Sequence, residues 1–475
     1  MTDNIMRVPS DGAKGFRDLR GSELDLRSDL TNKIMKTYKS YGFDMLETPA
    51  VEPTAALGGF LPDTDRPNGG AFSFSTDEGD LTLRYDLTAP LARFVAGQGD
   101  GLTKPWRRSS VGPVWRNEKT APGRYREFWQ CDADLVGTPC VGADAEMISM
   151  ADEALRNAGV GDFTIKVSNR KLLDGLLEGL GIADESRQRN IYRCIDKLDR
   201  LGTNGVAELL GPGRRDESGA YTAGQELSDP MIRAVIEFTA ARDIDKVATA
   251  IGETITGNAG LREIEECLSL AREAGAPAVL DPTIVRGLSY YSGTVFEMDL
   301  QGEILDESGM PRRVGSIGGG GRYDNLIRRF TGRDLPCVGF SIGVTRLAQA
   351  MSMRSVKSER PLRPILICVV EEDGMMRAQT MARELRAQGM PAQVWYGASR
   401  NIGRQMKYAD KIGASLAIIE GARERAAGEV VVKYLDLGRE ISQRAADRET
   451  WLSQEQQVSV AREGICLEID AYLAK

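Results

Sequence analysis

The sequence has 475 residues, 41% of them hydrophobic, which predicts about two to four domains and more than one packed core. Its net charge of −8 argues against a protein that coats nucleic acid through bulk charge, although local basic patches could still grip it. The chain contains no histidine, which excludes Ser-His-Asp and Cys-His nucleophile systems and histidine-ligated metal sites.

The cysteine spacing and the hydropathy of the sequence indicate in which cellular compartment the protein works. Seven cysteines lie far apart, without the paired CxxC spacing of a zinc site or redox pair, so we expect free thiols in a reducing cytoplasm. The N-terminus lacks the apolar stretch of a signal peptide, and no run approaches the roughly 18 apolar residues of a membrane span. We therefore expect a soluble cytoplasmic protein with no membrane partner.

The first predicted elements are a helix and a strand. Apolar side chains recur at near-helical spacing between Ser22 and Gly42, which predicts a capped amphipathic helix over residues 22–41. The next stretch, FDMLETPAVEP, favours a strand because Pro49 and Pro53 exclude a helix interior.

A strand-like region rich in turns follows, from about 75 to 137. Two of its strands surround a polar loop at Pro122 and Gly123, which predicts a hairpin. Residues 185–275 consist instead of long charged helical stretches. They predict a helical insertion within a larger sheet-based domain.

Two glycine-containing segments come after the insertion, VRGLSYYSGTVFE at 285–297 and SIGGGGRYD at 316–324. The four glycines 318–321 would let a backbone approach a ligand closely, but ordinary turns and bulges contain such runs as well. The spacing matches neither a Walker loop nor a dinucleotide fingerprint. The glycine run alone therefore fits either a ligand-binding segment or an ordinary turn or bulge.

The last part of the chain follows a polar tract at 351–364. Strand and helix patterns alternate after it, which predicts a small α/β domain with a mostly parallel sheet.

Arginines carry most of the chemistry that the residues suggest. An arginine-rich hairpin is usually a solvated face, but Arg116, Glu118, Phe128 and Gln130 occupy strand positions of equal parity and could share one face. Forked donors beside an aromatic ring suit a nucleotide. Nucleotidyl transfer needs no histidine, because it depends mostly on positioning and on charge stabilisation by arginine and Mg²⁺.

Five motifs in order resemble the histidyl-tRNA synthetase family of class II aminoacyl-tRNA synthetases. GFDMLETPAVEP is similar to the dimer-interface motif that ends in a proline, here Pro49. WRNEKTAPGRYREFWQCDADLVG resembles the second class motif, and VGFSIGVTRL resembles the third. VRGLSYYSGTVFE and GGGGRYDNL are similar to two segments peculiar to the histidine enzyme and its close relatives.

The resemblance implies an α+β catalytic domain, an antiparallel sheet flanked by helices, with a helical insertion and a C-terminal α/β anticodon-binding domain. We expect these parts at 1–350 for the catalytic domain, 185–275 for the insertion, 351–362 for a linker, 363–445 for the anticodon-binding domain and 446–475 for an extension. The implied enzyme is a homodimer that activates L-histidine with ATP to histidyl-adenylate. It then transfers histidine to the 3′-terminal adenosine of tRNA(His).

Site residues carry over from the motifs. Arg116 and Arg286 would neutralise charge at the α-phosphate. The implied ATP-binding residues are Arg116, Glu118, Arg124, Phe128 and Arg346. The implied histidine-binding residues are Asp86, Thr88, Gln130, Asp134, Arg286, Tyr290 and Tyr291. Mg²⁺ would be held mainly by the ATP phosphates, so no protein metal ligand is expected. Because adjacent strand side chains point opposite ways, a core position remains open for one of the two tyrosines.

Two residues depart from the family pattern. Ser289 stands where many relatives have an aspartate, which puts the polar network around the substrate in doubt. Thr345 stands where an acidic residue is common, which weakens any claim about a group that supports Arg346.

The C-terminal domain carries a basic stripe. Arg400, Arg404, Lys407 and Lys411 follow Ser399 at spacings of four, three and four, which would gather them on one helix face. Such a stripe is usually a solvated face, but in a net acidic protein with this resemblance we favour contact with tRNA phosphates.

Two other functions fit parts of the pattern. A paralogue of this family is a histidine-binding regulatory subunit of ATP phosphoribosyltransferase, which lacks the anticodon-binding domain and often its active-site arginines. A class II synthetase for threonine or proline would share the C-terminal domain but not RGLSYY and GGGRYD. The sequence leaves open the tRNA identity elements, the role of 446–475, and whether the absence of histidine is selected or reflects compositional drift.

Overall fold

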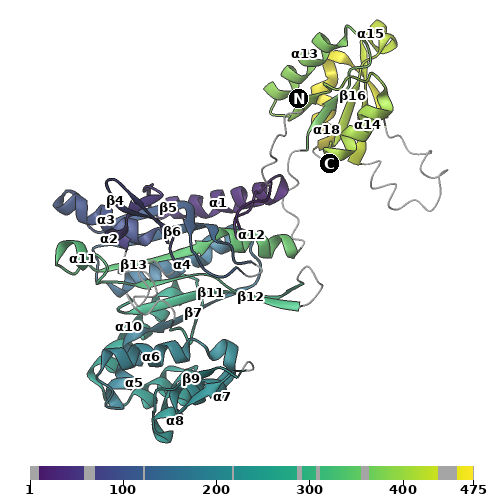
Figure 1. Ribbon diagram of the computed structural model, residues 1–475. Helices are drawn as coiled ribbons and strands as arrows, with labels where there is room; N and C mark the ends of the chain where they lie inside the picture. Colours follow the sequence, from purple (N-terminus) through teal and green to yellow (C-terminus); the bar gives the residue numbers. More distant parts are fainter. Residues whose placement is uncertain are drawn as a thin grey trace, which may run out of the picture. The chain divides into compact units, whose positions relative to one another are not determined.

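A computed structural model describes residues 10–57, 70–120, 123–216, 219–285, 291–305, 311–354, 363–436 and 457–473 (Figure 1). The chain divides into two compact units, Met1–Val356 and Lys357–Lys475, each with its own hydrophobic core. Among the helices in the described ranges, none combines the length and apolarity that a membrane crossing requires.

The first unit is built on one large mixed sheet. Within the described residues its strands follow the order β1 (Asp44–Met45), β5 (Trp106–Trp115), β6 (Glu127–Val136), β13 (Cys337–Gly343), β12 (Pro311–Arg322), β11 (Thr294–Leu305), β7 (Phe163–Asn169) and β10 (Ala278–Leu280). All central neighbours are antiparallel, and only the two edge pairs, β1 with β5 and β7 with β10, are parallel. The expected antiparallel sheet flanked by helices is thus confirmed.

Helices cover this sheet and bury its apolar side chains. The sheet packs against α1 (Ser22–Ser40), α4 (Val141–Asn157), α10 (Ile255–Glu273) and α12 (Val344–Met353). The helix predicted over 22–41 is α1, and its side chains Leu30, Ile34 and Tyr38 are fully buried in the core. Gly21 rather than Ser22 occupies the capping position.

A small second sheet lies in the same unit. Its strands are β2 (Val51–Pro53), β4 (Gly79–Leu83) and β3 (Ser73–Thr76), accompanied by α2 (Thr54–Leu57) and α3 (Thr88–Gln98). The stretch FDMLETPAVEP, expected as one strand, is therefore two short strands in different sheets, and Pro49 lies in the break between them.

The predicted insertion is mainly helical and forms the lower lobe in Figure 1. It comprises α6 (Glu185–Ile195), α7 (Leu198–Leu210), α8 (Asp229–Ala240), α9 (Ile244–Ile251) and the hairpin β8 (Gly213–Arg215) with β9 (Tyr221–Ala223), next to α5 (Arg170–Gly179) and α10. Glu263 on α10 ties this lobe to the sheet, because it accepts hydrogen bonds from Asn169 at 2.9 Å and from Lys171.

The second unit is a five-stranded sheet between helices. The strand order is β15 (Ala392–Val394), β14 (Ile365–Ile367), β16 (Leu416–Ile419), β17 (Glu429–Tyr434) and β18 (Gln457–Ala461). Within the described residues its helices are α13 (Gly374–Ala387), α14 (Ile402–Lys411), α15 (Ala422–Ala427) and α18 (Ile465–Leu473). The expectation of a mostly parallel sheet holds for the first three strands only, since β17 and β18 are antiparallel.

Candidate active site

A cavity of about 640 Å³ opens on the face of the large sheet. Its walls come from the segment before α3, the β5–β6 hairpin, β12, β13 and the start of α12. Ten of the twelve predicted ATP- and histidine-binding residues line it: Asp86, Thr88, Arg116, Glu118, Arg124, Phe128, Gln130, Asp134, Tyr291 and Arg346. The other two, Arg286 and Tyr290, lie outside the described residues, as does Ser289.

Arg116 lines the cavity and lies between two aromatic rings. Its guanidinium carbon is 4.4 Å from the centroid of the Tyr85 ring and 5.0 Å from that of Phe128. Arg116 and Glu118 lie beyond the end of β5, but the Arg116 N–H still pairs with the carbonyl of Arg126 at 2.8 Å. The shared face predicted from strand parity therefore persists past the strand itself.

Arg346 reaches the cavity from α12. Its Nη2 donates to the carbonyl of Val314 on β12 at 2.6 Å. The neighbouring Thr345, where the family often has an acidic residue, accepts a hydrogen bond from the backbone N–H of Trp129 at 2.9 Å. Thr345 thus joins α12 to β6 rather than pairing with Arg346.

A buried ion pair forms part of the cavity floor. Arg108 is fully buried, and its Nη1 donates to Asp134 Oδ2 at 2.5 Å while its Nη2 donates to the carbonyl of Leu87 at 2.9 Å. The Tyr323 hydroxyl donates to the other oxygen of Asp134. Burial raises the pKa of Asp134, and these two donors oppose that rise. Both Asp134 oxygens therefore already have donors in the protein.

Asp86 and Gln130 also line the cavity, and each has an oxygen that can accept a further hydrogen bond. Asp86 Oδ1 accepts from the backbone N–H groups of Thr88 at 3.2 Å and Ala89 at 2.9 Å, which satisfies free donors at the start of α3. Gln130 Nε2 donates to the Ser341 hydroxyl at 2.6 Å, and Gln130 Oε1 is buried without a partner among the described residues.

Sequence reasoning missed Asp132, which also lines the cavity. It is 2% exposed, and burial, followed by the charge of Asp134, raises its pKa to about 7. Asp132 lies on β6 between Gln130 and Asp134 with the same parity, so the alternation that selected its neighbours could have found it.

The glycine run 318–321 lies in β12 and not in a turn. A Cβ on Gly320 would lie 2.2 Å from the carbonyl oxygen of Gly339, and one on Gly321 would lie 2.5 Å from that of Thr294. Close packing against β11 and β13 therefore demands these glycines. Gly318 and Gly319 also line the cavity, so the run serves packing and the site together.

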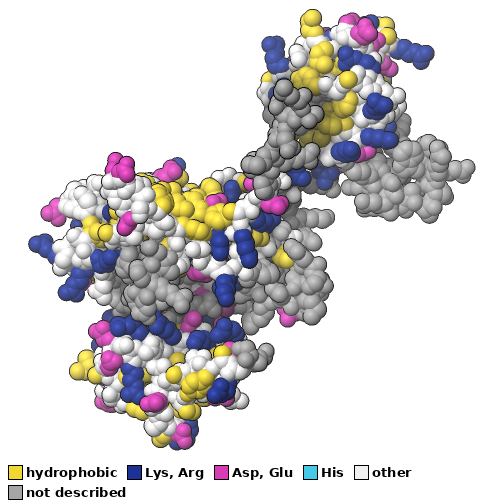
Figure 2. Space-filling model, viewed as in Figure 1, with side chains coloured by type: hydrophobic (Ala, Val, Ile, Leu, Met, Phe, Trp, Pro, Cys, Tyr) yellow, Lys and Arg dark blue, Asp and Glu magenta, His cyan; other side chains and the backbone are white. Residues whose placement is uncertain are grey.

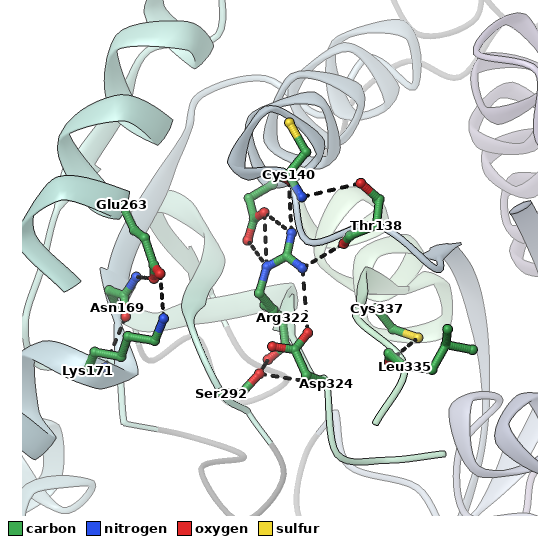
Figure 3. A network of polar contacts seen from close by, with 11 residues as sticks. Thr138, Cys140, Asn169, Lys171, Glu263, Ser292, Arg322, Asp324, Leu335 and Cys337 are labelled. Atoms are coloured by element: carbon green, nitrogen blue, oxygen red, sulfur yellow. Dashed lines mark hydrogen bonds and ion pairs between the residues drawn. The ribbon is translucent and has the colours of Figure 1, made fainter. Parts of the chain in front are cut away.

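Arg322, at the end of β12, attaches this strand to the segment that precedes α4 (Figure 3). It pairs with the buried Asp144 on α4 and donates to the carbonyls of Thr138 at 2.9 Å and Cys140 at 3.0 Å. Its own carbonyl accepts from the backbone N–H of Ser292 at 2.8 Å. Arg322 thereby fixes the end of β12, just before Tyr323, and holds Ser292, the residue after Tyr291.

The predicted basic stripe lies on the second unit. Arg404, Lys407 and Lys411 are exposed on α14, whereas Arg400 is exposed just before the helix, which Asn401 caps through its side chain. Figure 2 shows basic side chains gathered along the side of this unit where α14 lies in Figure 1. Ile402, the first residue of α14, is 39% exposed.

Two protein-family models match the chain, one on each of its two units. The histidyl-tRNA synthetase family model matches residues 15–347, and an anticodon binding domain model matches residues 365–455. The histidine–tRNA ligase of Ruegeria pomeroyi is 44% identical, with 99% of this chain and 98% of the relative covered.

Two solved structures are similar over most of the chain. The histidyl-tRNA synthetase from Nostoc sp. PCC 7120 is 27% identical with a TM-score of 0.76, covering 98% of this chain and 100% of that one. An ATP phosphoribosyltransferase regulatory subunit/histidyl-tRNA synthetase from Bacillus halodurans C is 22% identical with a TM-score of 0.67, covering 85% and 97%. At 22% identity the second similarity bears on the fold alone.

Proposed function

The chain belongs to the histidyl-tRNA synthetase family, and we propose that its cavity joins histidine to ATP and then passes the histidyl group to tRNA(His). The observation that carries this proposal is the convergence of Arg116, Arg124 and Arg346, distant in the chain, on a cavity that also holds acidic and amide side chains. Guanidinium groups suit a triphosphate, and carboxylates suit an amino acid's ammonium group.

The nucleotide would bind at the end of the cavity that contains Arg116 and Phe128. Phe128 offers a planar ring for adenine, and Glu118 offers an acceptor for its amino group. The contacts of Arg116 with two rings hold its guanidinium in the cavity, where it would meet the α-phosphate. Arg124 and Arg346 would bind the outer phosphates.

Histidine would bind over β6. Asp86 and Gln130 have acceptor capacity for the ammonium group, with Thr88 beside them. Asp134 and Tyr291 would bind the imidazole, with Tyr290 lining the pocket. Because Arg108 and Tyr323 hold the Asp134 carboxylate, it would use remaining lone pairs in a fixed orientation.

The chemistry would run in two steps. The histidine carboxylate attacks the α-phosphorus, an O–P bond forms, and the bond to the β-phosphate bridging oxygen breaks, which releases pyrophosphate. The hydroxyl of the tRNA's terminal adenosine then attacks the carbonyl carbon of the adenylate, and AMP leaves. Arg116 would stabilise the negative charge that grows on the α-phosphate, and Arg286 would share that role.

Mg²⁺ would supply further charge neutralisation at the phosphates. The described residues contain no group of three or more acidic or cysteine side chains that could hold a metal ion. We propose that Mg²⁺ is held mainly by the ATP phosphates.

Transfer RNA would contact the second unit through Arg400, Arg404, Lys407 and Lys411. All four side chains are exposed, so their charges can reach a phosphate backbone. All seven cysteines are free thiols, in keeping with the cytoplasmic location that we propose.

A homodimer is part of the proposal. Met45 at the edge of the large sheet is 65% exposed, and Phe74 on β3 is 46% exposed. Figure 2 shows a band of hydrophobic side chains across the part of the first unit that carries α1, β4 and β5 in Figure 1. A surface of this kind favours a protein partner. Sedimentation should show that the wild type is a dimer and that Phe74→Glu has a higher dimer dissociation constant. A wild type that sediments as a monomer would contradict the homodimer.

The alternative is a histidine-binding regulatory subunit. It is less favoured, because the Ruegeria relative named histidine–tRNA ligase covers the whole chain and the anticodon binding domain model matches the second unit. Charging of tRNA separates the two functions.

Aminoacylation with labelled histidine is the test. The wild type should charge tRNA(His), and Arg116→Ala should reduce the rate about 100-fold or more. Arg383→Ala, on the exposed side of α13, is the matched control and should charge normally. A wild type that binds histidine without charging tRNA would show the proposal to be wrong.

A further inference from the structure

One carboxylate in the cavity has no role in the proposed function so far. Asp132 lies on β6 with its side chain 2% exposed, and its Oδ1 has no hydrogen-bond partner among the described residues. The Ser341 hydroxyl, opposite it on β13, bonds to the carboxylate. Ser341 thus orients Asp132 and leaves one oxygen unused.

A second unused acceptor lies beside it. Gln130 is two residues away on the same face of β6, and its Nε2 donates to the same Ser341 hydroxyl at 2.6 Å. Its Oε1 is buried and has no partner among the described residues. Two oriented acceptors without donors in one cavity indicate a ligand that brings several N–H groups, because buried acceptors are normally satisfied.

The charges around Asp132 favour a cationic ligand. Three carboxylates line this end of the cavity: Asp86, Asp132 and Asp134. Arg108 bonds directly to Asp134, whereas neither Asp86 nor Asp132 has an ion pair within the described residues. Arg116 acts electrostatically on Asp86, and Arg84 and Arg108 act on Asp132, but within the described residues none of these arginines forms a direct ion pair with either carboxylate. Asp86 and Asp132 are therefore the carboxylates left for a positive group.

We propose that Asp132 Oδ1 accepts a hydrogen bond from the α-ammonium group of histidine, which makes Asp132 a specificity-determining residue. This inference rests on the proposed function and deepens it. An ammonium group has three N–H donors, and Asp86, Gln130 Oε1 and Asp132 Oδ1 offer three acceptors. An amino acid without a free amino group would leave two of these acceptors buried and unpaired.

Titration calorimetry with the full chain tests the contact. Asp132→Asn keeps the size of the side chain and removes its charge. It should weaken binding of histidine and of histamine, which both carry the amine, about tenfold or more. Binding of imidazole-4-propionate, which lacks only the amine of histidine, should change less than about twofold. Asp100→Asn, exposed in the short 3-10 helix Gly99–Gly101, is the matched control and should bind all three ligands as the wild type does.

Each outcome decides the inference. Equal losses for all three ligands would place the contact at the imidazole, and no loss would mean that Asp132 Oδ1 meets only water; either result overturns it. Asp132→Ala is the second variant and should show the same selective loss if Asp132→Asn does not fold. A wild type that binds neither histidine nor histamine would instead refute the proposed function.

Discussion

At the scale of single residues, Asp134 shows how the fold prepares the cavity. Arg108 and Tyr323 hold its carboxylate from the protein side, and Gly339 on the neighbouring strand leaves room for it. A Cβ built on Gly339 would lie 2.1 Å from Asp134 Oδ1, too close for any real contact. Arg108 on β5, Tyr323 just after β12 and Gly339 on β13 therefore determine the position of the Asp134 side chain.

Gly339→Ala should displace Asp134 and also lower the stability of the sheet, because the added Cβ would lie 2.7 Å from the carbonyl oxygen of Ala133. The expected result is a KM for histidine raised about tenfold with the KM for ATP little changed, because the added Cβ meets Asp134 and the carbonyl of Ala133 and neither Arg116 nor Phe128. Pyrophosphate exchange at varied histidine and ATP measures both values. Gly97→Ala is the control, since a Cβ there meets nothing within 4 Å. Equal KM values for histidine in the two variants would contradict the packing described for Gly339.

Asp132 should make stability depend on pH. Its pKa is raised to about 7 by burial, so the folded chain binds this proton more tightly than the unfolded chain, where the pKa is about 3.9. The protonated carboxyl group of Asp132 therefore stabilises the folded chain at low pH, and this contribution to the free energy of unfolding is lost as pH rises through about 7. The charged groups that face Asp132 are Asp86, Asp134, Arg84 and Arg108.

Asp132→Asn removes this titration. The variant should therefore gain stability relative to the wild type between pH 5 and pH 8, on the order of 2–4 kcal/mol. Thermal unfolding of both proteins without substrate at the two pH values measures the gain. A stability difference that is the same at both pH values would mean that Asp132 does not titrate in this range.

Sequence reasoning found site residues where side-chain alternation or a motif marked them. Arg116, Phe128 and Gln130 followed from parity on two strands, and all three line the cavity. The partners of Thr345 and Asp134 could not be predicted, because they depend on contacts between strands far apart in sequence.

At the scale of elements, β12 depends on α4. Arg322 and Asp144 form a buried ion pair between them, and Figure 3 shows the carbonyls of Thr138 and Cys140 completing the donors of Arg322. The pair holds the end of β12, where the preceding glycines 318–321 have no side chains that could pack against α4.

Asp144→Asn should destabilise the first unit by about 3–5 kcal/mol, because it leaves a buried guanidinium without its counter-charge. Urea unfolding measures the loss. The double variant Arg322→Met/Asp144→Leu should recover much of it, since neither side chain then carries a buried charge. A single variant as stable as the wild type would show that the pair is not coupled to folding.

The order and type of elements were largely predictable, whereas strand breaks and partners were not. The apolar spacing of 22–41 gave α1, because helical amphipathicity is local. FDMLETPAVEP reads as one strand, yet its halves pair with β5 and β4 in different sheets. The antiparallel β17 and β18 escaped prediction, because strand direction is set by partners and not by composition.

At the scale of the whole molecule, the chain forms two units with separate hydrophobic cores. The cavity lies within the first unit, and the basic stripe lies on the second. Amino-acid activation and tRNA affinity should therefore respond to different substitutions.

Arg404→Glu/Lys407→Glu should weaken tRNA binding and reduce its salt dependence by roughly one to two units of slope, because each phosphate contact releases counterions. Filter binding across salt concentrations measures both effects, and histidine activation should stay unchanged. Arg383→Glu/Arg423→Glu changes the net charge equally on α13 and α15 and is the control. The same loss in both double variants would indicate bulk charge and not the stripe.

The most direct measurement is exchange of labelled pyrophosphate into ATP with each amino acid in turn, for the wild type and Arg116→Ala. Histidine alone should support exchange, and the variant should lose it about 100-fold or more. Exchange with a different amino acid, or none with histidine, would contradict the activation of histidine in this cavity.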